Sequence, residues 1–277
     1  MDYLAKKYLR PEKIPSTACR GCGLGQVHKK VLLAIDELGL STADIVWGTG
    51  IGCAGRQTFN TWRGDNFAGT HGRVYAIATG LRLALAPAKK IILTVGDGDA
   101  FGIGLLHLLH CARRNVGITV IVADNFGYQS TGGQYGWTTP NGAVTDSSPY
   151  GMQEPNWVQD GRDILAILKA AGAGFLARHT SVEGQNAVES IKQAIQFKGF
   201  SLVHIVYPCV TNFAGKALGS RQPVVAYQWL ADRTNSPAEH KVDGITFKTG
   251  IYYQDPQNRP EFAAKMRSFT AAVQKGD

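Results

Sequence analysis

Short apolar runs in the middle of the chain alternate with longer segments in which apolar residues recur every three or four positions. Residues 90–95 (KIILTV) and 118–123 (ITVIVA) are uninterrupted and rich in β-branched side chains, which is typical of strands buried on both faces of a parallel sheet. Residues 71–86 have helical spacing instead. The apolar positions of that segment are Val74, Ile77, Ala78, Leu81 and Leu85.

The alternation continues over most of the chain. Further strands are predicted at 44–47, 174–179 and 201–207, and further helices at 100–114, 163–171 and 182–197. Strands that alternate with helices of this length form right-handed βαβ units, so we predict an α/β fold with a mostly parallel sheet and helices on both faces.

Two segments are polar and weakly periodic, and we expect neither to join the sheet. We predict an N-terminal arm at 1–17, a central domain at 18–213 and a C-terminal arm at 214–277. The segment 125–157 is a long loop rich in Gly, Ser, Thr, Tyr and Pro. A loop of this length inside a compact domain is usually functional.

The sharpest local signal is the sequence GDGD at 96–99, which follows one predicted strand and precedes a helix. The turn therefore lies at the carboxyl edge of the sheet, where open α/β folds bind ligands. A plain turn and a dinucleotide site are the alternatives. A dinucleotide loop presents bare backbone N–H groups to a pyrophosphate, whereas the carboxylates of Asp97 and Asp99 would repel it. Mg²⁺ resolves the conflict, because it bridges carboxylates to phosphates. The predicted magnesium ligands are Asp97, Asn125 and the backbone carbonyl of Gly127.

The chain has five cysteines, an odd number that favours metal ligation or burial over a disulfide framework. Cys19 and Cys22 form a C-x-x-C pair, and Cys53 and Cys209 follow predicted strands. Four thiolates suit zinc or an iron–sulfur cluster, and their number alone does not separate the two. Nearby glycines leave backbone N–H groups free to bond to cluster sulfides, which favours iron and sulfur. We interpret Cys111, in an apolar helical segment, as a small buried hydrophobe.

Composition narrows the class of partner. The net charge of +8 suits anionic ligands or an acidic partner. The Lys and Arg residues are scattered and no nucleic-acid-binding signature is present, so we expect no nucleic acid. No segment is apolar enough to span a bilayer, and residues 1–15 lack the apolar stretch of a secretory signal. We therefore expect a cytoplasmic protein that does not contact a membrane.

Several motifs, in order, resemble the β subunit of the 2-oxoacid:ferredoxin oxidoreductases over nearly all of residues 1–213. The matching residues are Cys19-Arg-Gly-Cys22-Gly, Gly50-Ile-Gly-Cys53, His71-Gly-Arg73, Ala78-Thr-Gly80, Gly96-Asp-Gly-Asp99, Asp124-Asn125, Thr131-Gly-Gly-Gln134 and Pro208-Cys-Val-Thr211. The GDG turn and the Asn after the next strand also resemble the general thiamine diphosphate motif.

The resemblance implies one four-iron four-sulfur (4Fe–4S) cluster held by Cys19, Cys22, Cys53 and Cys209. It implies that the predicted Mg²⁺ ligands act on the diphosphate of thiamine diphosphate. The other cofactor-binding residues that it implies are Gly50, Ile51, Gly52, Gly96, Gly98, Asp99, Thr131 and Gly132. The implied reaction is oxidative decarboxylation of a 2-oxoacid, with the acyl group passing to coenzyme A and the electrons to ferredoxin. The resemblance also implies that the reaction can run in reverse.

The family carries the Glu that activates thiamine on a separate pyrimidine-binding domain. The resemblance therefore implies an α subunit with that Glu, in a dimer of αβ dimers. His71 and Arg73 are the candidate catalytic residues, because they suit substrate carboxylates; capping of the following helix is the alternative.

The sequence Pro208-Cys-Val-Thr resembles the 2-oxoglutarate branch of the family, so we predict 2-oxoglutarate as the substrate. Asn212-Phe213 and Trp137-Thr-Thr-Pro140 depart from the family pattern. The alternative function is a non-redox thiamine diphosphate-dependent decarboxylase whose cysteines bind structural zinc.

Overall fold

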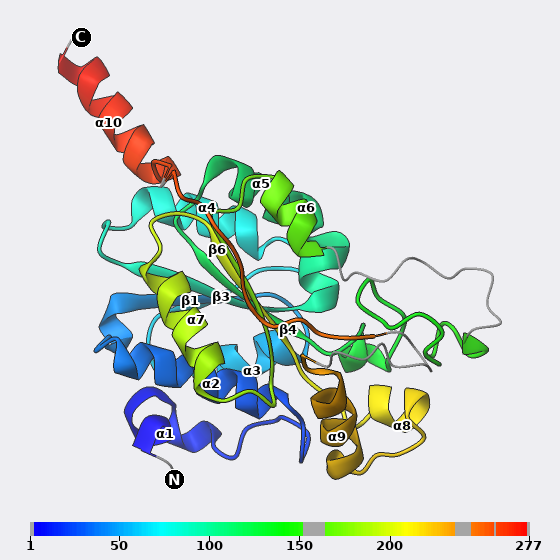
Figure 1. Ribbon diagram of the computed structural model, residues 1–277. Helices are drawn as coiled ribbons and strands as arrows, with labels where there is room; N and C mark the ends of the chain where they lie inside the picture. The colour runs from blue at the N-terminus through cyan, green and yellow to red at the C-terminus, as the bar shows by residue number, and fades with distance from the viewer. Residues whose placement is uncertain (1–2, 152–163, 236–244, 258, 276–277) are drawn as a thin grey trace.

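The computed structural model describes residues 3–151, 164–235, 245–257 and 259–275. Within these ranges the chain forms a seven-stranded sheet with the strand order β2-β1-β3-β4-β6-β5-β7 (Figure 1). The strands are β1 (Ile45–Thr49), β2 (Asn66–Ala68), β3 (Lys90–Gly96), β4 (Thr119–Asp124), β5 (Phe175–Thr180), β6 (Ser201–Val206) and β7 (Gly250–Gln254). All neighbouring pairs are parallel except β5 and β7. The predicted α/β fold with a mostly parallel sheet is confirmed.

Helices cover both faces of the sheet, because successive side chains on a strand point to opposite sides. On β3, Ile92 belongs to one hydrophobic cluster, whereas Ile91 and Leu93 belong to the other. The first face is covered by α1 (Tyr3–Tyr8), α2 (Leu24–Glu37), α3 (Cys53–Thr61) and α7 (Gln185–Gln196). The second is covered by α4 (Val74–Ala84), α5 (Leu105–Arg114) and α6 (Ile164–Ala170). The two layers of helices leave only the sheet edges open to loops.

The segment after β3 departs from a regular helix. A π-helical turn, η3 (Gly98–Ile103), precedes α5, and Gly102 has non-helical dihedrals of φ −89° and ψ −112°. The predicted helix at 100–114 is therefore interrupted directly after the GDGD turn. Such π-helical turns are frequent at functional sites. The short 3₁₀ helices are η1 (Pro11–Lys13), η2 (Thr42–Asp44) and η4 (Gln129–Thr131).

The expectation that no segment after Cys209 joins the sheet is wrong. β7 pairs antiparallel with β5, with Tyr253 opposite Leu176. The strand is hard to recognise because it is an edge strand, with Ile251 46% and Tyr252 49% exposed. The same part of the chain forms α8 (Phe213–Ala217), α9 (Pro223–Arg233) and α10 (Phe262–Lys275). The boundaries of the predicted arms stay a prediction.

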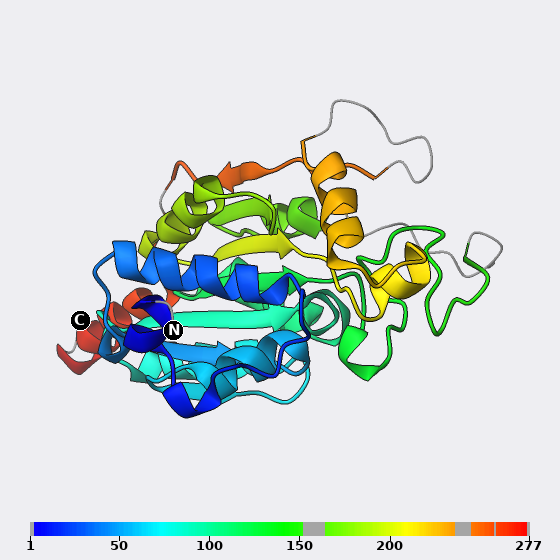
Figure 2. The ribbon, with the colours of Figure 1, turned by 90° about the horizontal axis from the view of Figure 1, so that it is seen from below.

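The carboxyl ends of the parallel strands meet at one edge of the sheet. Figure 2 shows the arrowheads directed to the side on which α8 and α9 lie. Phe213 of α8 packs against Phe126, after β4, with ring centroids 4.6 Å apart. In contrast, α10 projects away from the body of the molecule (Figure 1).

Parts of four predicted segments lie outside the described residues: 1–2 of the N-terminal arm, 152–157 of the long loop, residue 163 of the helix at 163–171, and 236–244, 258 and 276–277 of the C-terminal arm. In the part of the chain that is described, no helix has both the length and the apolar character needed to cross a membrane.

Candidate functional site

The loops that follow β1, β3 and β4 enclose a cavity of about 270 Å³ at the carboxyl edge of the sheet. We call it the diphosphate cavity. The predicted cofactor residues that line it are Ile51, Gly52, Gly96, Asp97, Gly98, Asp99, Asn125, Gly127 and Thr131, and His71 lines it as well. Of the predicted set, Gly50, Gly132 and Arg73 do not line it. Arg73 is exposed at the N-terminus of α4 and makes no side-chain capping bond, so the structure separates it from His71.

The three predicted magnesium ligands converge. One terminal atom of the Asn125 amide lies 3.1 Å from the Gly127 carbonyl oxygen and 3.2 Å from Oδ1 of Asp97, while the other lies 2.7 Å from the Tyr207 hydroxyl. With nitrogen in the first position, the amide donates two hydrogen bonds. With oxygen there, the Asn125 oxygen lies from each of the other two at about the spacing of adjacent ligands in a magnesium octahedron, about 3.0 Å for bonds of about 2.1 Å. The donor set therefore fits Mg²⁺.

The electrostatics of the cavity agree with a cation. Burial raises the pKa of Asp97, and the neighbouring charge of Asp124 raises it further. Burial also raises the pKa of Asp124. Two buried carboxyl groups that are costly to ionise together become stable as anions when a divalent cation is close.

Asp99 belongs to the same turn, but its carboxylate serves the walls of the cavity. Its Oδ1 accepts a hydrogen bond from the Gly72 N–H at 2.9 Å and a longer one from the Ile51 N–H at 3.4 Å. The same oxygen lies 2.6 Å from Nδ1 of His71. Gly50 leaves the room for this carboxylate, because a Cβ there would lie 2.0 Å from Oδ2 of Asp99. Asp99 thus joins the loop after β1 and the turn before α4 to the GDGD turn.

The residues at this site that were not singled out from the sequence include Tyr128, Thr138 and Tyr207. Tyr128 packs on the GDGD turn, and a Cβ on Gly98 would lie 2.6 Å from its ring. The Thr138 hydroxyl lies 2.8 Å from Oδ2 of Asp97. The only signal for Tyr207 was its position at the end of a predicted strand. Tyr128 and Thr138 lie within the long loop at 125–157. The length of this loop predicted that it is functional, but not which of its residues contact the site.

The four predicted cluster cysteines surround a second cavity, of about 230 Å³, which we call the cysteine cavity. The lining cysteines are Cys19, Cys22, Cys53 and Cys209. The Gly23 N–H donates to the Pro208 carbonyl at 3.3 Å, which brings the C-x-x-C loop to the loop after β6. Cys111 lies apart from them, buried on α5 with its Sγ 3.4 Å from Oγ1 of Thr79.

Two thiols of the cysteine cavity, those of Cys22 and Cys53, lie in a low-polarity environment. Burial raises the pKa of Cys22 to about 12, with smaller contributions from the other three thiols. Burial also raises the pKa of Cys53. The Asn212 N–H donates to Sγ of Cys209 at 3.5 Å, as backbone amides do around ligating sulfurs. Bound metal replaces the protons of such thiols, so this donor set fits a metal centre.

The two cavities share one wall. The residues that line both are Cys53, Arg56, Asn125, Gln129 and Ser130. Within the wall, Nη2 of Arg56 donates to Oγ of Ser130 at 2.8 Å. The predicted cluster and the predicted diphosphate site are therefore neighbours.

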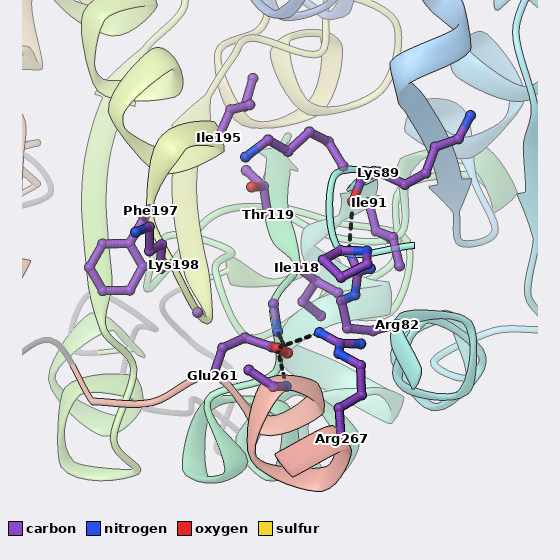
Figure 3. A pocket seen from close by; sticks show the side chains of 15 residues that line it. Arg82, Lys89, Ile91, Ile118, Thr119, Ile195, Phe197, Lys198, Glu261 and Arg267 are labelled. Carbon is purple, nitrogen blue, oxygen red and sulfur yellow. Dashed lines mark hydrogen bonds and ion pairs between the residues drawn. The ribbon is translucent and has the colours of Figure 1, made fainter. Parts of the chain in front are cut away.

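A larger cavity, of about 330 Å³, lies at the opposite edge of the sheet, where β3 and β4 begin (Figure 3). Its cationic side chains are Arg82, Lys89, Lys90, Lys198 and Arg267. The guanidinium of Arg82 donates to the Lys89 and Ala86 carbonyls, each at 2.6 Å. Glu261 accepts from the Gly117 N–H at 2.9 Å and attaches α10 to the body. These contacts are structural, and open α/β folds bind their ligands at the other edge.

Comparison with known families defines the class. Residues 50–205 match the family model described as thiamine pyrophosphate enzyme, C-terminal TPP binding domain. The match covers more than half of the chain, including the loops that form the diphosphate cavity. The chain therefore contains the thiamine diphosphate-binding domain of a thiamine-dependent enzyme.

Individual relatives define the family more closely. The chain is 37% identical over 230 residues to the 2-oxoglutarate synthase subunit KorB of Methanocaldococcus jannaschii, covering 83% of this chain and 82% of that one. It is 37% identical over 258 residues to 2-oxoacid:ferredoxin oxidoreductase 2, subunit beta, of Aeropyrum pernix, covering 93% and 78%.

A solved structure agrees with these relatives. The 2-oxoglutarate:ferredoxin oxidoreductase from Magnetococcus marinus, with 2-oxoglutarate, coenzyme A and succinyl-CoA bound, superimposes with a TM-score of 0.81. The two are 26% identical, and the match covers 98% of this chain and 90% of that one. The chain belongs to the β subunits of the 2-oxoacid:ferredoxin oxidoreductases. It is a subunit of a heteromeric redox enzyme with an α subunit, so the alternative of a non-redox decarboxylase is wrong.

Proposed function

We propose that this chain, together with its α subunit, oxidises 2-oxoglutarate to an acyl-coenzyme A and CO₂ and delivers the electrons to ferredoxin. The observation that carries the proposal is the wall shared by the diphosphate cavity and the cysteine cavity. Electrons released at the first cavity have only this wall to cross to reach the second. The same arrangement serves the reverse reaction.

The diphosphate cavity would hold thiamine diphosphate through Mg²⁺ on Asp97, Asn125 and the Gly127 carbonyl. Thiamine diphosphate, when bound, supplies the nucleophilic carbon and the electron sink of the reaction. The chain's own residues bind and orient it. Asp97 and Asn125 fix the position of the diphosphate, while Tyr128 and His71 form the opposite wall with ring centroids 6.1 Å apart.

The cysteine cavity would hold a 4Fe–4S cluster on Cys19, Cys22, Cys53 and Cys209. A single zinc ion draws its four ligands to one point. The four cysteines line a cavity of about 230 Å³, and this space between them suits a cluster with several metal atoms.

The choice of 2-oxoglutarate rests on the relatives from Methanocaldococcus jannaschii and Magnetococcus marinus, which are named for that substrate. His71 lines the diphosphate cavity and is the candidate for contact with a substrate carboxylate. Arg56, exposed in the shared wall, places a guanidinium beside the cavity. Arg73 is exposed and does not line the cavity, so its predicted catalytic role has less support than that of His71. The coenzyme A requirement rests on the Magnetococcus marinus structure, in which coenzyme A and succinyl-CoA are bound.

The proposal extends to the assembly. The α subunit would supply the pyrimidine-binding domain and the activating Glu, in a dimer of αβ dimers. The net charge of +8 favours an acidic electron acceptor, which suits ferredoxin.

The test uses the αβ complex purified without oxygen. Iron and acid-labile sulfide near four each per β chain, with reduction of ferredoxin that requires both 2-oxoglutarate and coenzyme A, are expected. Pyruvate is the matched alternative substrate. Faster ferredoxin reduction with pyruvate would reject the substrate assignment, and zinc without sulfide would reject the cluster.

A further inference from the structure

A row of buried polar side chains leads from β5, beside the edge strand β7, to Asp97. Nε of Arg178 donates to Nδ1 of His204 at 3.2 Å. Nε2 of His204 lies 2.8 Å from Oδ2 of Asp124. The Thr138 hydroxyl lies 2.8 Å from Oδ1 of Asp124 and also 2.8 Å from Oδ2 of Asp97. Four contacts thus connect β5, β6 and β4 to the turn after β3.

The parallel register of the sheet brings these residues together. Arg178 on β5 lies opposite His204 on β6, and His204 lies opposite Val122 on β4. Asp124 is two residues beyond Val122, so its side chain is on the same face. Arg178 is 9%, His204 4% and Asp124 2% exposed. Buried polar groups of this kind are retained only with hydrogen-bond partners, so the row acts as one unit.

The contacts give each member a defined role. Because the Arg178 N–H occupies Nδ1 of His204, the proton of the neutral ring lies on Nε2 and is donated to Asp124. Asp124 also accepts from the Phe126 N–H at 2.9 Å. Its carboxylate therefore cannot rotate without breaking several bonds. Held in this way, Asp124 keeps the Thr138 hydroxyl beside Asp97.

Thr138 determines which oxygen of Asp97 is available. Oδ2 of Asp97 faces the Thr138 hydroxyl and accepts from the Gly127 N–H at 2.7 Å. Oδ1 is the oxygen that faces the Asn125 amide. With Oδ2 tied on one side, the carboxylate presents Oδ1 to the point where the three oxygens converge.

We propose that Arg178, His204, Asp124 and Thr138 are positioning residues, which orient the Asp97 carboxylate toward the metal that carries the diphosphate. The proposal rests on the magnesium site proposed above. Outer partners of metal ligands typically contribute about 10- to 100-fold to metal affinity. Thr138 is the member that touches Asp97 directly, so its hydroxyl is expected to have the largest effect.

The test measures the Mg²⁺ concentration that half-saturates thiamine diphosphate binding to the αβ complex, followed by circular dichroism, with iron content as the check on assembly. T138V removes the hydroxyl at nearly constant shape and is expected to raise that concentration about 10- to 100-fold. T138S keeps the hydroxyl and is expected to restore it to within about threefold of the unchanged protein.

A second pair of variants tests the far end of the row. H204Q retains an N–H near Nε2, whereas H204L does not, so only H204L is expected to weaken Mg²⁺ binding. The matched control is H179L on the neighbouring strand. His179 is also buried, but its Nε2 lies 2.8 Å from Oγ of Ser190, away from this row. Equal effects of H204L and H179L would mean a general loss of stability and would overturn the proposal.

The positioning role and the magnesium site fail in different ways. If D97A binds Mg²⁺ and thiamine diphosphate normally, the magnesium site itself is rejected. If D97A loses binding while T138V and H204L bind like the unchanged protein, the site stands and the positioning role is rejected.

Discussion

Nδ1 of His71 lies 2.6 Å from Oδ1 of Asp99, whose side chain is fully buried. The contact joins two segments that are distant in the sequence. His71 comes from the turn before α4, and Asp99 from the turn after β3. Asp99 also accepts hydrogen bonds from the backbone N–H groups of Gly72 and Ile51. One carboxylate therefore holds the turn before α4 and the loop after β1, which both contribute to the diphosphate cavity.

The first prediction concerns this carboxylate. D99N keeps the shape of the side chain but removes its carboxylate, so the contact with His71 and the hydrogen bonds from the Gly72 and Ile51 N–H groups lose a charged acceptor. We expect kcat/KM for the 2-oxoacid to fall about tenfold or more, because charged hydrogen bonds contribute about 1.5–3 kcal/mol. Steady-state kinetics of the αβ complex measures this. E189Q, at an exposed ion pair with Lys192, is the control and should leave kcat/KM unchanged.

A second prediction separates the two cofactors. D97A removes one of the proposed magnesium ligands and should abolish thiamine diphosphate binding, while iron and sulfide stay at the level of the unchanged complex. Isothermal titration with Mg²⁺ and thiamine diphosphate, beside iron analysis, provides the readouts. Turnover at the normal rate in D97A would contradict the magnesium assignment.

Cysteine substitutions provide the third prediction. C53A should lose iron and sulfide, because Cys53 lines the cysteine cavity. C111A should retain both, since Cys111 is buried on α5 beside Thr79. C111A is expected to cost only about 1 kcal/mol of stability, for a small apolar group in the core. Similar iron contents in the two variants would show that the ligand choice is incorrect.

The fourth prediction concerns pH and Mg²⁺. Burial raises the pKa of Asp97 and Asp124, so between the ordinary Asp range and the raised values the folded, metal-free chain holds protons that the unfolded chain has lost. The free energy of unfolding should therefore fall as pH rises through this window. Mg²⁺ with thiamine diphosphate favours the ionised carboxylates and should remove that decline.

Thermal unfolding midpoints of the metal-free complex, measured across this window with and without both ligands, are the test. D97N provides the control, because it removes one of the two carboxyl groups. The prediction would be contradicted if the unfolding midpoint of the metal-free complex rose with pH between the ordinary Asp pKa and the raised pKa values of Asp97 and Asp124.

The fifth prediction concerns the close approach of Gly50 to Asp99. In G50A the new methyl group would lie only 2.0 Å from Oδ2 of Asp99, so one of the two must move. The displacement should cost about 1–3 kcal/mol, as overpacking does in other cores. G80A is the matched change in α4, where a Cβ meets no atom within 4 Å. It should stabilise by about 0.5–1 kcal/mol, because Ala suits a helix better than Gly. Denaturant unfolding of the two variants compares these values.

The central strands were predictable because they carry their own signal. The runs at 90–95 and 118–123 became Lys90–Gly96 and Thr119–Asp124, within one residue at each end. A strand that is buried on both faces has apolar side chains at nearly every position. This continuous apolar run can be recognised in the sequence without knowing which strands lie beside it. The strand β7 is different, since its exposed outer residues give no such pattern and only its pairing with β5 defines it.

The site divides in the same way. Asp97 and Asn125 follow strands, so their proximity could be expected from the parallel topology alone. Thr138 lies in a loop, and its contact with Asp97 depends on a path of the backbone that no periodicity describes. The position of His204 beside Asp124 depends on strand order, because β6 lies next to β4 although β5 comes between them in the sequence.

The wall between the two cavities limits how either can change. A substitution in this wall changes both cavities, because each of its residues lines both. These residues are Cys53, Arg56, Asn125, Gln129 and Ser130. If oxygen destroyed a cluster bound to Cys53, the Cys53 side chain would lose its bond to the metal. That side chain is part of the wall that borders the diphosphate cavity. Under the proposed assignment, loss of the cluster is therefore expected to disturb the neighbouring diphosphate cavity as well.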